Sequence, residues 1–331
     1  MAVDPVPPGM CQSCAMTTPG SSRARSGIGL VALAAGLWGT DALFRRGLAL
    51  ELPAATVVFA EHLLLAAITA PLLWRDRQAL RGLSRGDWTA VLLIGAGASA
   101  TATVLFTAAF RYGDPTSVLL LQKLQPVVAV VAAMVLLGER LRPRFGLYFF
   151  AAVAGGWLIA FADPLAVSVR SAQAALLAVG AATLWAFGTV LGRRLAVVVA
   201  APTLAALRFV VGLPASAILV LLFVGTGGLR VPTGAVVPLV GLALIPGLLA
   251  LSLYYRGLRT TPASAATLAE LAFPLSAILV NRLAFGATLT PTQWAGVAVL
   301  MVTLVIMSLQ PGGREIGVRA PHPRRPAAEL T

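Results

Sequence analysis

Long apolar stretches alternate with short polar segments along most of the chain. A helix needs about 20 mainly apolar residues to cross a bilayer core, and ten stretches come close to that length. Backbone N–H and C=O groups inside lipid must be satisfied within their own segment, so each stretch is expected to be a helix. The expected spans are 27–44, 54–73, 88–110, 117–137, 145–162, 173–191, 203–225, 235–255, 263–283 and 292–309. The pattern predicts an all-α polytopic membrane protein with ten transmembrane helices.

Two polar tails flank this apolar region. Residues 1–25 are rich in Pro, Gly, Ser and Thr without the apolar run of a cleavable signal peptide, and residues 311–331 are basic, so we expect both to be disordered. Met16 is a second candidate start. Cys11 and Cys14 form a C-x-x-C pair, which can bind zinc or cycle as a dithiol, but the sequence lacks the second C-x-x-C or βαβ context that would support either role. We expect no metal site and no cofactor.

Composition excludes a soluble protein of this size. Hydrophobic residues make up 58% of the 331 residues and charged residues only 11%, against about 45–50% and about 25% in soluble proteins. The formal net charge of +13 would suit a nucleic-acid binder if the basic residues gathered on one polar surface. They fall mostly between apolar runs instead, so the expected partner is the lipid bilayer and no nucleic acid.

The arginines also indicate the orientation, because positive charge is retained on the cytoplasmic side of a membrane. With a cytoplasmic N-terminus, the inside segments hold 17 arginines and the outside segments hold six. The six are Arg45, Arg46, Arg111, Arg170, Arg230 and Arg282. We therefore expect a multi-pass protein of the plasma (inner) membrane with both termini in the cytoplasm.

The chain contains an internal duplication. Residues 37–46, with Leu-Trp at the start and Arg-Arg at the end, are echoed by residues 184–194 at an offset of about 147. Residues 122–126 (Gln-Lys-Leu-Gln-Pro) match residues 270–274 (Glu-Leu-Ala-Phe-Pro) at an offset of 148. Five helices per unit is an odd number, so the second unit must enter the membrane from the opposite side, as in the inverted-topology repeats of secondary transporters. The two units are expected to cover 26–163 and 172–310.

Three short motifs resemble a known family. They are Trp38-Gly39 in the first helix, Leu207-Arg208-Phe209 in the seventh, and Leu137-Gly138-Glu139-Arg140-Leu141 after the fourth helix, which has a proline at its centre. Their order over 26–310 is similar to that of the drug/metabolite transporter superfamily, in its branch with two EamA domains. The resemblance implies a ten-helix exporter or importer of small metabolites with a central cavity between the two units.

Five ionisable residues fall inside expected helices, where each costs about 2.5–3.5 kcal/mol on insertion scales and tends to be paired or functional. They are Asp41, Glu61, Lys123, Arg208 and Glu270. Lys123 is the only lysine among the 25 Lys and Arg residues, and its compact ammonium can lose a proton when it is desolvated. It either snorkels to an interface or serves the function.

Glu270 is the expected partner of Lys123. It precedes a proline by four residues, as Gln122 does, so two pseudo-symmetric helices bring a carboxylate and Lys123 toward the bilayer centre. Gln122 and Gln125 share a helical face with the proline that follows them, which predicts a polar cavity wall. We expect Lys123 and Glu270 to face this cavity and to bind or gate the substrate.

Three further residues are candidates beside this pair. Asp41 is expected to contribute the proton site. Trp38, three residues earlier, is either an aromatic wall of the cavity or an anchor at the membrane interface. Tyr254 is a candidate for substrate contact.

Glu61 and Arg208 occupy equivalent positions, 147 residues apart, in the two units. An unpaired charge inside a membrane is expensive, so we expect a structural ion pair between the second and seventh helices, with a transport role as the alternative. His62 either relays protons or forms a hydrogen bond to a neighbour.

These features favour a secondary active transporter that moves a small metabolite or drug-like solute by alternating access, driven by a proton gradient or by exchange. The sequence holds no phosphate-binding loop, G-x-S-x-G or H-E-x-x-H motif, so neither an ATP-driven pump nor an enzyme is expected. Two alternatives stay open: a membrane-embedded transferase acting on lipid-linked substrates, which would need a nucleophile or metal cluster, and a non-transporting scaffold, which would not need charges at depth. The expected partners are a small-molecule substrate and the bilayer, with a homodimer left open.

Overall fold

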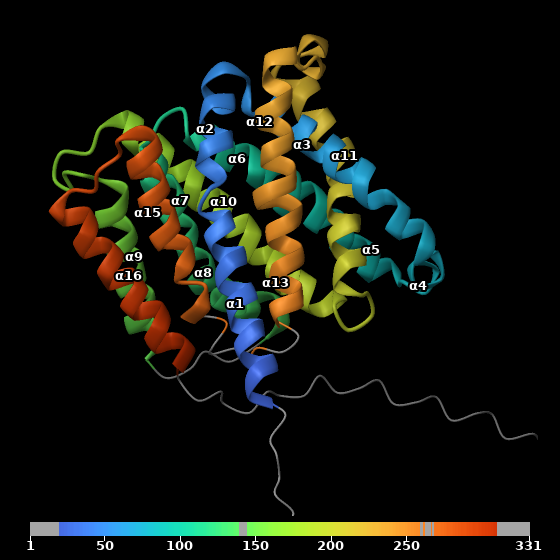
Figure 1. Cartoon of the computed structure of the whole chain (residues 1–331), viewed down its shortest axis with the longest axis horizontal. Coiled ribbons are helices and arrows are strands. Elements are labelled where there is room, and N and C mark those ends of the chain that lie inside the picture. The colour runs from blue at the N-terminus through green and yellow to red at the C-terminus, as the bar shows by residue number, and fades with distance from the viewer. Residues whose placement is uncertain (1–19, 139–143, 259–260, 262–265, 267, 310–331) are drawn as a thin grey trace, which may run out of the picture.

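A bundle of helices makes up the protein (Figure 1). The structure is a computed structural model and describes residues 20–138, 144–258, 261, 266 and 268–309. All regular elements within those residues are helical, mostly α-helices with short π- and 3-10 segments. Several residues named above lie outside the described part of the chain: Cys11, Cys14, Met16, Glu139, Arg140, Leu141 and the tail 311–331.

Within the described residues, eight helical stretches are long and apolar enough to cross a membrane, and two shorter apolar helices accompany them. The long stretches are Gly27–Glu51, Ala54–Arg75, Arg85–Ala109, Pro115–Leu136, Val169–Leu195, Ala201–Phe223, Thr233–Leu258 and Pro291–Leu309. The shorter helices are Phe145–Ala160 and Ala272–Phe285. The protein is therefore a polytopic membrane protein.

Several spans are divided into more than one element. The first half contains α1 (Gly20–Trp38), α2 (Asp41–Glu51), α3 (Ala54–Arg75), α4 (Arg77–Arg81), α5 (Arg85–Leu92), η1 (Leu93–Thr101), α6 (Ala102–Ala109), α7 (Pro115–Leu121), η2 (Gln122–Leu124), α8 (Gln125–Leu137) and α9 (Phe145–Ala160). The second half contains α10 (Val169–Leu195), α11 (Ala201–Phe223), η3 (Thr226–Leu229), η4 (Thr233–Ala235), α12 (Val236–Leu242), η5 (Ala243–Leu249), α13 (Ala250–Leu258), α15 (Ala272–Phe285) and α16 (Pro291–Leu309).

Two boundaries differ from the sequence-based expectation. α1 begins at Gly20, inside the segment 1–25 that the sequence predicts to be disordered. The first span continues to Glu51 instead of ending at residue 44. Arg45, assigned above to an outside segment, is a buried residue of α2 with 4% of its surface exposed, so only five of those six arginines remain candidates for outside segments.

Helices of the two halves are interleaved. α3 packs against α11, and α9 packs against α16. α1 packs against α13 while α10 packs against α6, and α1 contacts α15 while α10 contacts α8. Exchanging the halves turns α1 into α10, α13 into α6 and α15 into α8, so each contact of α1 with the second half has an equivalent contact of α10 with the first half. This is the pattern that an approximate two-fold axis produces.

Local irregularities also recur in both halves. The third span of each half contains a π-helical segment, η1 in the first and η5 in the second. α8 ends at Gly138 with φ 68°, and α15 ends at Gly286 with φ 63°. Glycine adopts this left-handed conformation without the steric cost that a Cβ brings, so both helices stop at matching positions of the two halves.

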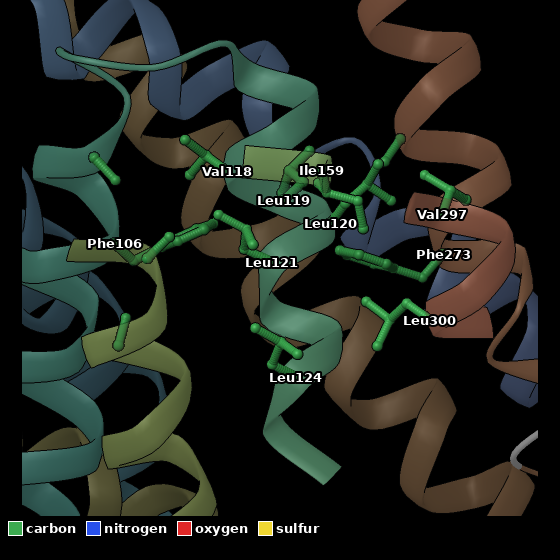
Figure 2. Packing of buried hydrophobic residues seen from close by; sticks show 14 of the residues in the cluster. Phe106, Val118, Leu119, Leu120, Leu121, Leu124, Ile159, Phe273, Val297 and Leu300 are labelled. Atoms are coloured by element: carbon green, nitrogen blue, oxygen red, sulfur yellow. The ribbon is translucent and has the colours of Figure 1, made fainter. Parts of the chain in front are cut away.

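The largest cluster of buried apolar side chains surrounds α7 (Figure 2). Leu119, Leu120 and Leu121 are at most 2% exposed. Figure 2 shows them between Phe106 on one side and Phe273 on the other. The cluster therefore joins helices of both halves and fixes α7 directly before the chain turns into η2.

α9 and α16 approach each other backbone to backbone at one edge of the bundle (Figure 1). A Cβ added to Gly296 would lie 2.7 Å from the carbonyl oxygen of Gly155, and a Cβ added to Gly155 would lie 3.0 Å from the carbonyl oxygen of Gly296. Small residues permit such close contacts between membrane helices.

Replacing Gly296 with valine should force these two helices apart. We expect the free energy of unfolding to fall by roughly 1–3 kcal/mol, as overpacking of a tight contact does, and thermal unfolding of the purified protein measures the loss. Gly146→Ala is the matched control, because nothing lies within 4 Å of a Cβ added to Gly146 on α9. A Gly296→Val protein as stable as the wild type would contradict the tight contact.

Candidate functional site

The candidate site lies where two helices are broken. After α7 the chain forms the 3-10 turn η2, and the backbone N–H of Gln125 donates to the carbonyl of Gln122. In the second half the N–H of Phe273 donates to the carbonyl of Glu270, at 3.1 Å. A proline follows each of these turns and has no N–H to continue the α-helical ladder. Residues 122–126 and 270–274, which are 148 residues apart, therefore share the same turn of the backbone as well as a similar sequence.

Lys123 and Glu270 meet at these breaks. Lys123 Nζ lies 3.7 Å from Glu270 Oε2, and the two side chains remain 17% and 29% exposed. The hydroxyl of Tyr254 on α13 donates to Glu270 Oε1 at 2.6 Å. Lys123 Nζ also lies 4.7 Å from the centre of the Phe273 ring. A cation, a carboxylate and two aromatic rings from three different spans thus gather at one point of the bundle.

The first span reaches the same group through Trp38. The centres of the Trp38 and Tyr254 rings are 4.9 Å apart. The next residue, Gly39, lies against α15, because a Cβ added to it would be 2.8 Å from Ala277 N and 2.9 Å from the carbonyl oxygen of Phe273. Trp38, at the point where α1 ends, therefore packs against the tyrosine that binds Glu270.

A cavity of about 200 Å³ lies beside the pair. Lys123 and Glu270 are the charged residues of its described lining, and Ser308 adds a hydroxyl group. The rest of the lining is apolar: Pro126, Val130, Leu271, Met301, Leu304, Val305 and Met307. The structure brings both members of the predicted pair to one cavity, between α8, α16 and the residues that precede α15.

The two glutamines of the predicted polar wall lie differently. Gln125 Nε2 donates to Thr189 Oγ1 at 3.1 Å, so this side chain is directed toward α10. Gln122 is half-buried within η2. Of the polar residues in this stretch, Lys123 is the one that lines the cavity.

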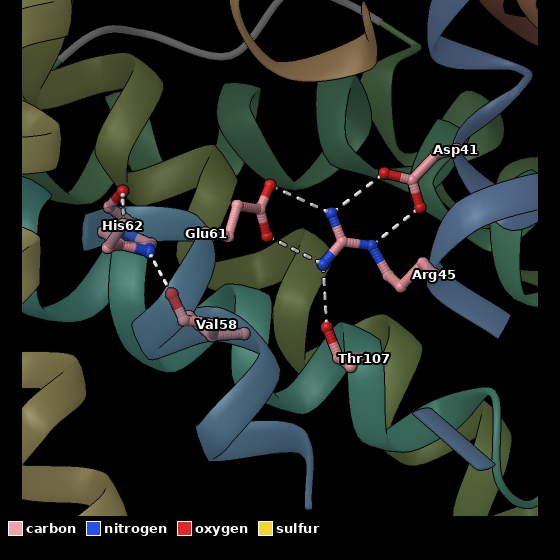
Figure 3. A network of polar contacts seen from close by, with 7 residues as sticks. Asp41, Arg45, Val58, Glu61, His62 and Thr107 are labelled. Carbon is pink, nitrogen blue, oxygen red and sulfur yellow. Dashed lines mark hydrogen bonds and ion pairs between the residues drawn. The ribbon is translucent and has the colours of Figure 1, made fainter. Parts of the chain in front are cut away.

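A second charged network surrounds Arg45 (Figure 3). The guanidinium donates to Asp41 from Nε and Nη2, at 2.7 and 2.9 Å, and to Glu61 from Nη1 and Nη2, at 3.1 and 3.3 Å. Nη1 also donates to Thr107 Oγ1 at 2.9 Å. All four residues are at most 9% exposed. The five N–H donors of the guanidinium are thereby satisfied, and the network ties α2 to α3 and α6.

The predicted ion pair between Glu61 and Arg208 is wrong. Glu61 binds Arg45 instead, and Arg208 donates from Nε to Ser99 Oγ at 3.1 Å and from Nη2 to the carbonyl of Ala98 at 3.4 Å. Asp41, expected above as a proton site near the cavity, is likewise bound to Arg45 and is not one of the cavity-lining residues.

His62 has a partner at each ring nitrogen. Nδ1 lies 2.9 Å from the carbonyl oxygen of Val58, which can only accept, so Nδ1 carries a proton. Nε2 lies 2.9 Å from Ser99 Oγ. Because Arg208 donates to the same hydroxyl, Ser99 connects His62 to Arg208. The alternative of a hydrogen bond to a neighbour thus describes His62 in this structure.

The model of the EamA-like transporter family matches residues 25–161 and 172–309. The chain belongs to the EamA-like transporter family. This EamA-like transporter is 32% identical over 293 residues to the riboflavin transporter ImpX of Fusobacterium nucleatum. The aligned region covers 84% of this chain and 96% of the relative. The chain is 29% identical over 288 residues to the uncharacterized transporter YwfM of Bacillus subtilis, across 85% of this chain and 93% of the relative.

The fold of this EamA-like transporter also resembles a solved crystal structure. The sequence identity is 20%, the TM-score is 0.58, and the match covers 87% of this chain and 96% of the other. At that identity the likeness concerns the fold alone. Together with the two EamA domains, the fold makes the protein a multi-pass membrane transporter.

The sequence interpretation of this EamA-like transporter did not pair Arg45 with Asp41 and Glu61, and it missed Thr107. Arg45 lies four residues after Asp41, a spacing that pairs opposite charges on one helix face. Ending the first span at residue 44 hid that signal, because it assigned Arg45 to a loop. Thr107 carried no signal, since a threonine in an apolar helix commonly donates to its own backbone.

Proposed function

We propose that this protein is a secondary active transporter that moves a small solute across the plasma membrane by alternating access. Ten transmembrane helices form two inverted five-helix units, both termini are cytoplasmic, and the substrate site is at Lys123 and Glu270. One observation carries the proposal: matching helix breaks of the two halves meet at a cation and a carboxylate beside a cavity. Secondary transporters build their substrate sites from broken helices near the bilayer midplane.

The contacts between the halves support the inverted arrangement. The pair α1–α13 corresponds to α10–α6, and the pair α1–α15 corresponds to α10–α8, while α3–α11 and α9–α16 correspond to themselves. A two-fold axis in the membrane plane produces such a pattern. The shorter apolar helices α9 and α15 complete five spans in each half.

The charge pair gives this transporter a way to couple binding of substrate in the cavity to opening and closing of the cavity. When the cavity is open, water hydrates Lys123 and Glu270. When it closes, each group needs the other, the substrate or a proton as partner, because an uncompensated charge inside the membrane is costly. Closure is therefore favoured only in states in which both charges are satisfied.

Riboflavin is the first substrate to test, because the 32% identical relative ImpX is named as a riboflavin transporter. The purified protein would be reconstituted into liposomes, and uptake of labelled riboflavin measured against protein-free liposomes. Accumulation that follows an imposed pH gradient indicates proton coupling, and stimulation by riboflavin loaded inside indicates exchange. If neither riboflavin nor a panel of other small metabolites moves in either mode, the proposal fails.

The proposed topology makes a separate prediction. Reporter domains inserted in the 75–87 loop and fused after residue 309 should both be found in the cytoplasm, because the inside segments carry the excess of arginine. A reporter inserted in the 161–169 connection should lie outside. Finding the loop and the C-terminus on opposite sides would contradict the five-helix units.

A further inference from the structure

The charges of the cavity cancel. Among the ten described lining residues, Lys123 contributes +1 and Glu270 contributes −1, and their charged atoms are 3.7 Å apart. A solute with a net charge would leave that charge uncompensated when the cavity closes, at a depth where charge is expensive. A solute without net charge leaves the balance intact, so the site selects for neutrality.

The pair offers one donor and one acceptor side by side. The distance of 3.7 Å between Lys123 Nζ and Glu270 Oε2 exceeds that of a hydrogen bond, so both atoms can still bind another group. The other carboxylate oxygen, Oε1, is occupied by the Tyr254 hydroxyl. A ligand edge with a carbonyl next to an N–H fits this arrangement, because the carbonyl accepts from Lys123 while the N–H donates to Glu270.

The surroundings of the pair suit a flat apolar body. The Phe273 ring lies beneath Lys123 Nζ, the Tyr254 hydroxyl binds Glu270, and the Trp38 ring packs against the Tyr254 ring. Met301 and Met307 line the cavity, and methionine sulfur makes favourable contacts with aromatic rings while its chain adapts to their shape.

We propose, resting on the proposed function, that Lys123 and Glu270 recognise the carbonyl and N–H edge of an uncharged heterocyclic ring. The transporter therefore accepts neutral rings of this kind and rejects their ionised derivatives. A zwitterionic amino acid would also balance the two charges, but the apolar side chains that make up most of the described cavity lining favour a larger apolar body. It serves as the competing outcome in the test.

Binding of three flavins to the purified protein tests this inference, read from quenching of flavin fluorescence. Riboflavin has a neutral ring with the carbonyl and N–H edge, 3-methylriboflavin blocks the N–H, and 8-carboxyriboflavin adds a charge to the ring. We expect wild-type protein to bind riboflavin at least about tenfold more tightly than either analogue. Glu270→Gln leaves Lys123 unbalanced, so its preference should shift toward the carboxylated ring. Gln125→Ala, altered at a side chain directed toward α10, should keep the wild-type preference.

The charge-balanced double variant Lys123→Met with Glu270→Gln covers the case in which a single variant does not fold. It should no longer distinguish riboflavin from 3-methylriboflavin. If flavins do not bind but hypoxanthine, another neutral ring with this edge, raises the thermal stability and Glu270→Gln removes the effect, the inference holds and riboflavin is not the substrate. If tryptophan or charged solutes raise the thermal stability of the protein and neutral rings do not, the inference is overturned. The proposed function is tested separately, by transport activity in liposomes.

Discussion

Arg45→Met should give the largest loss of folded protein among the substitutions considered. Removal of the guanidinium leaves Asp41 and Glu61 facing each other as buried carboxylates, both at most 9% exposed. Breaking a buried pair by removing one partner costs about 3–5 kcal/mol, and here two partners are stranded. Folded yield from gel filtration in detergent, together with the thermal unfolding temperature, measures the effect.

Two controls separate charge stranding from loss of packing. Arg46→Met changes the neighbouring arginine, which stacks over the Phe285 ring at 4.6 Å, and should cost about 1 kcal/mol or less. The triple variant Asp41→Asn, Arg45→Met, Glu61→Gln removes all three charges and should recover much of the yield. If the triple variant were as unstable as Arg45→Met, packing and not charge would explain the loss.

Lys123→Met and Glu270→Gln should act in the opposite way, on transport and not on folding. Their side chains keep 17% and 29% exposed, so water can hydrate the group that remains and the folded yield should stay near that of the wild type. Transport should fall on the order of 100-fold, about 2.7 kcal/mol in the barrier, because closure would then trap an unpaired charge.

Initial rates in proteoliposomes, divided by the amount of folded protein inserted, measure this effect for whichever solute the wild type carries. Gln125→Ala is the matched control in the same helix break and should transport normally, since that side chain bonds to Thr189. Wild-type rates in both charge variants would move the substrate site elsewhere in the bundle, with Trp38 and Tyr254 as the next residues to examine.

The apolar pattern and the repeat offset were sufficient to predict the helical fold and to bring Lys123 next to Glu270. The prediction succeeds because residues 122–126 and 270–274 are helix breaks that meet, so equivalence in the repeat coincides with contact. For Glu61 and Arg208 it does not. Each is the eighth residue of its helix, α3 or α11, but Glu61 is bound by Arg45 and Arg208 donates to Ser99 and Ala98, so each side chain is satisfied by a partner other than its repeat equivalent.

The Arg45 network could have been found only by allowing the first span to contain charge. Hydropathy ends a helix at an Arg-Arg pair, because two guanidinium groups in lipid are costly. In the folded protein one of them is satisfied by Asp41 and Glu61 and the other stacks on a ring. Asp41 lies one turn earlier in the same helix, whereas Glu61 and Phe285 come from other helices, so a local window of sequence contains only part of the compensation.

The charge pair at the cavity takes one member from each half of the chain. A protein made of two identical halves would therefore lack this pair. Two copies of the first half would bring a glutamine and a lysine from each side, and two copies of the second half would bring a glutamate and a leucine from each side. Neither combination assembles a cation beside a carboxylate. Once the halves had diverged at these positions, they had to be inherited together, and two separately expressed halves should restore transport only when both are present in one cell.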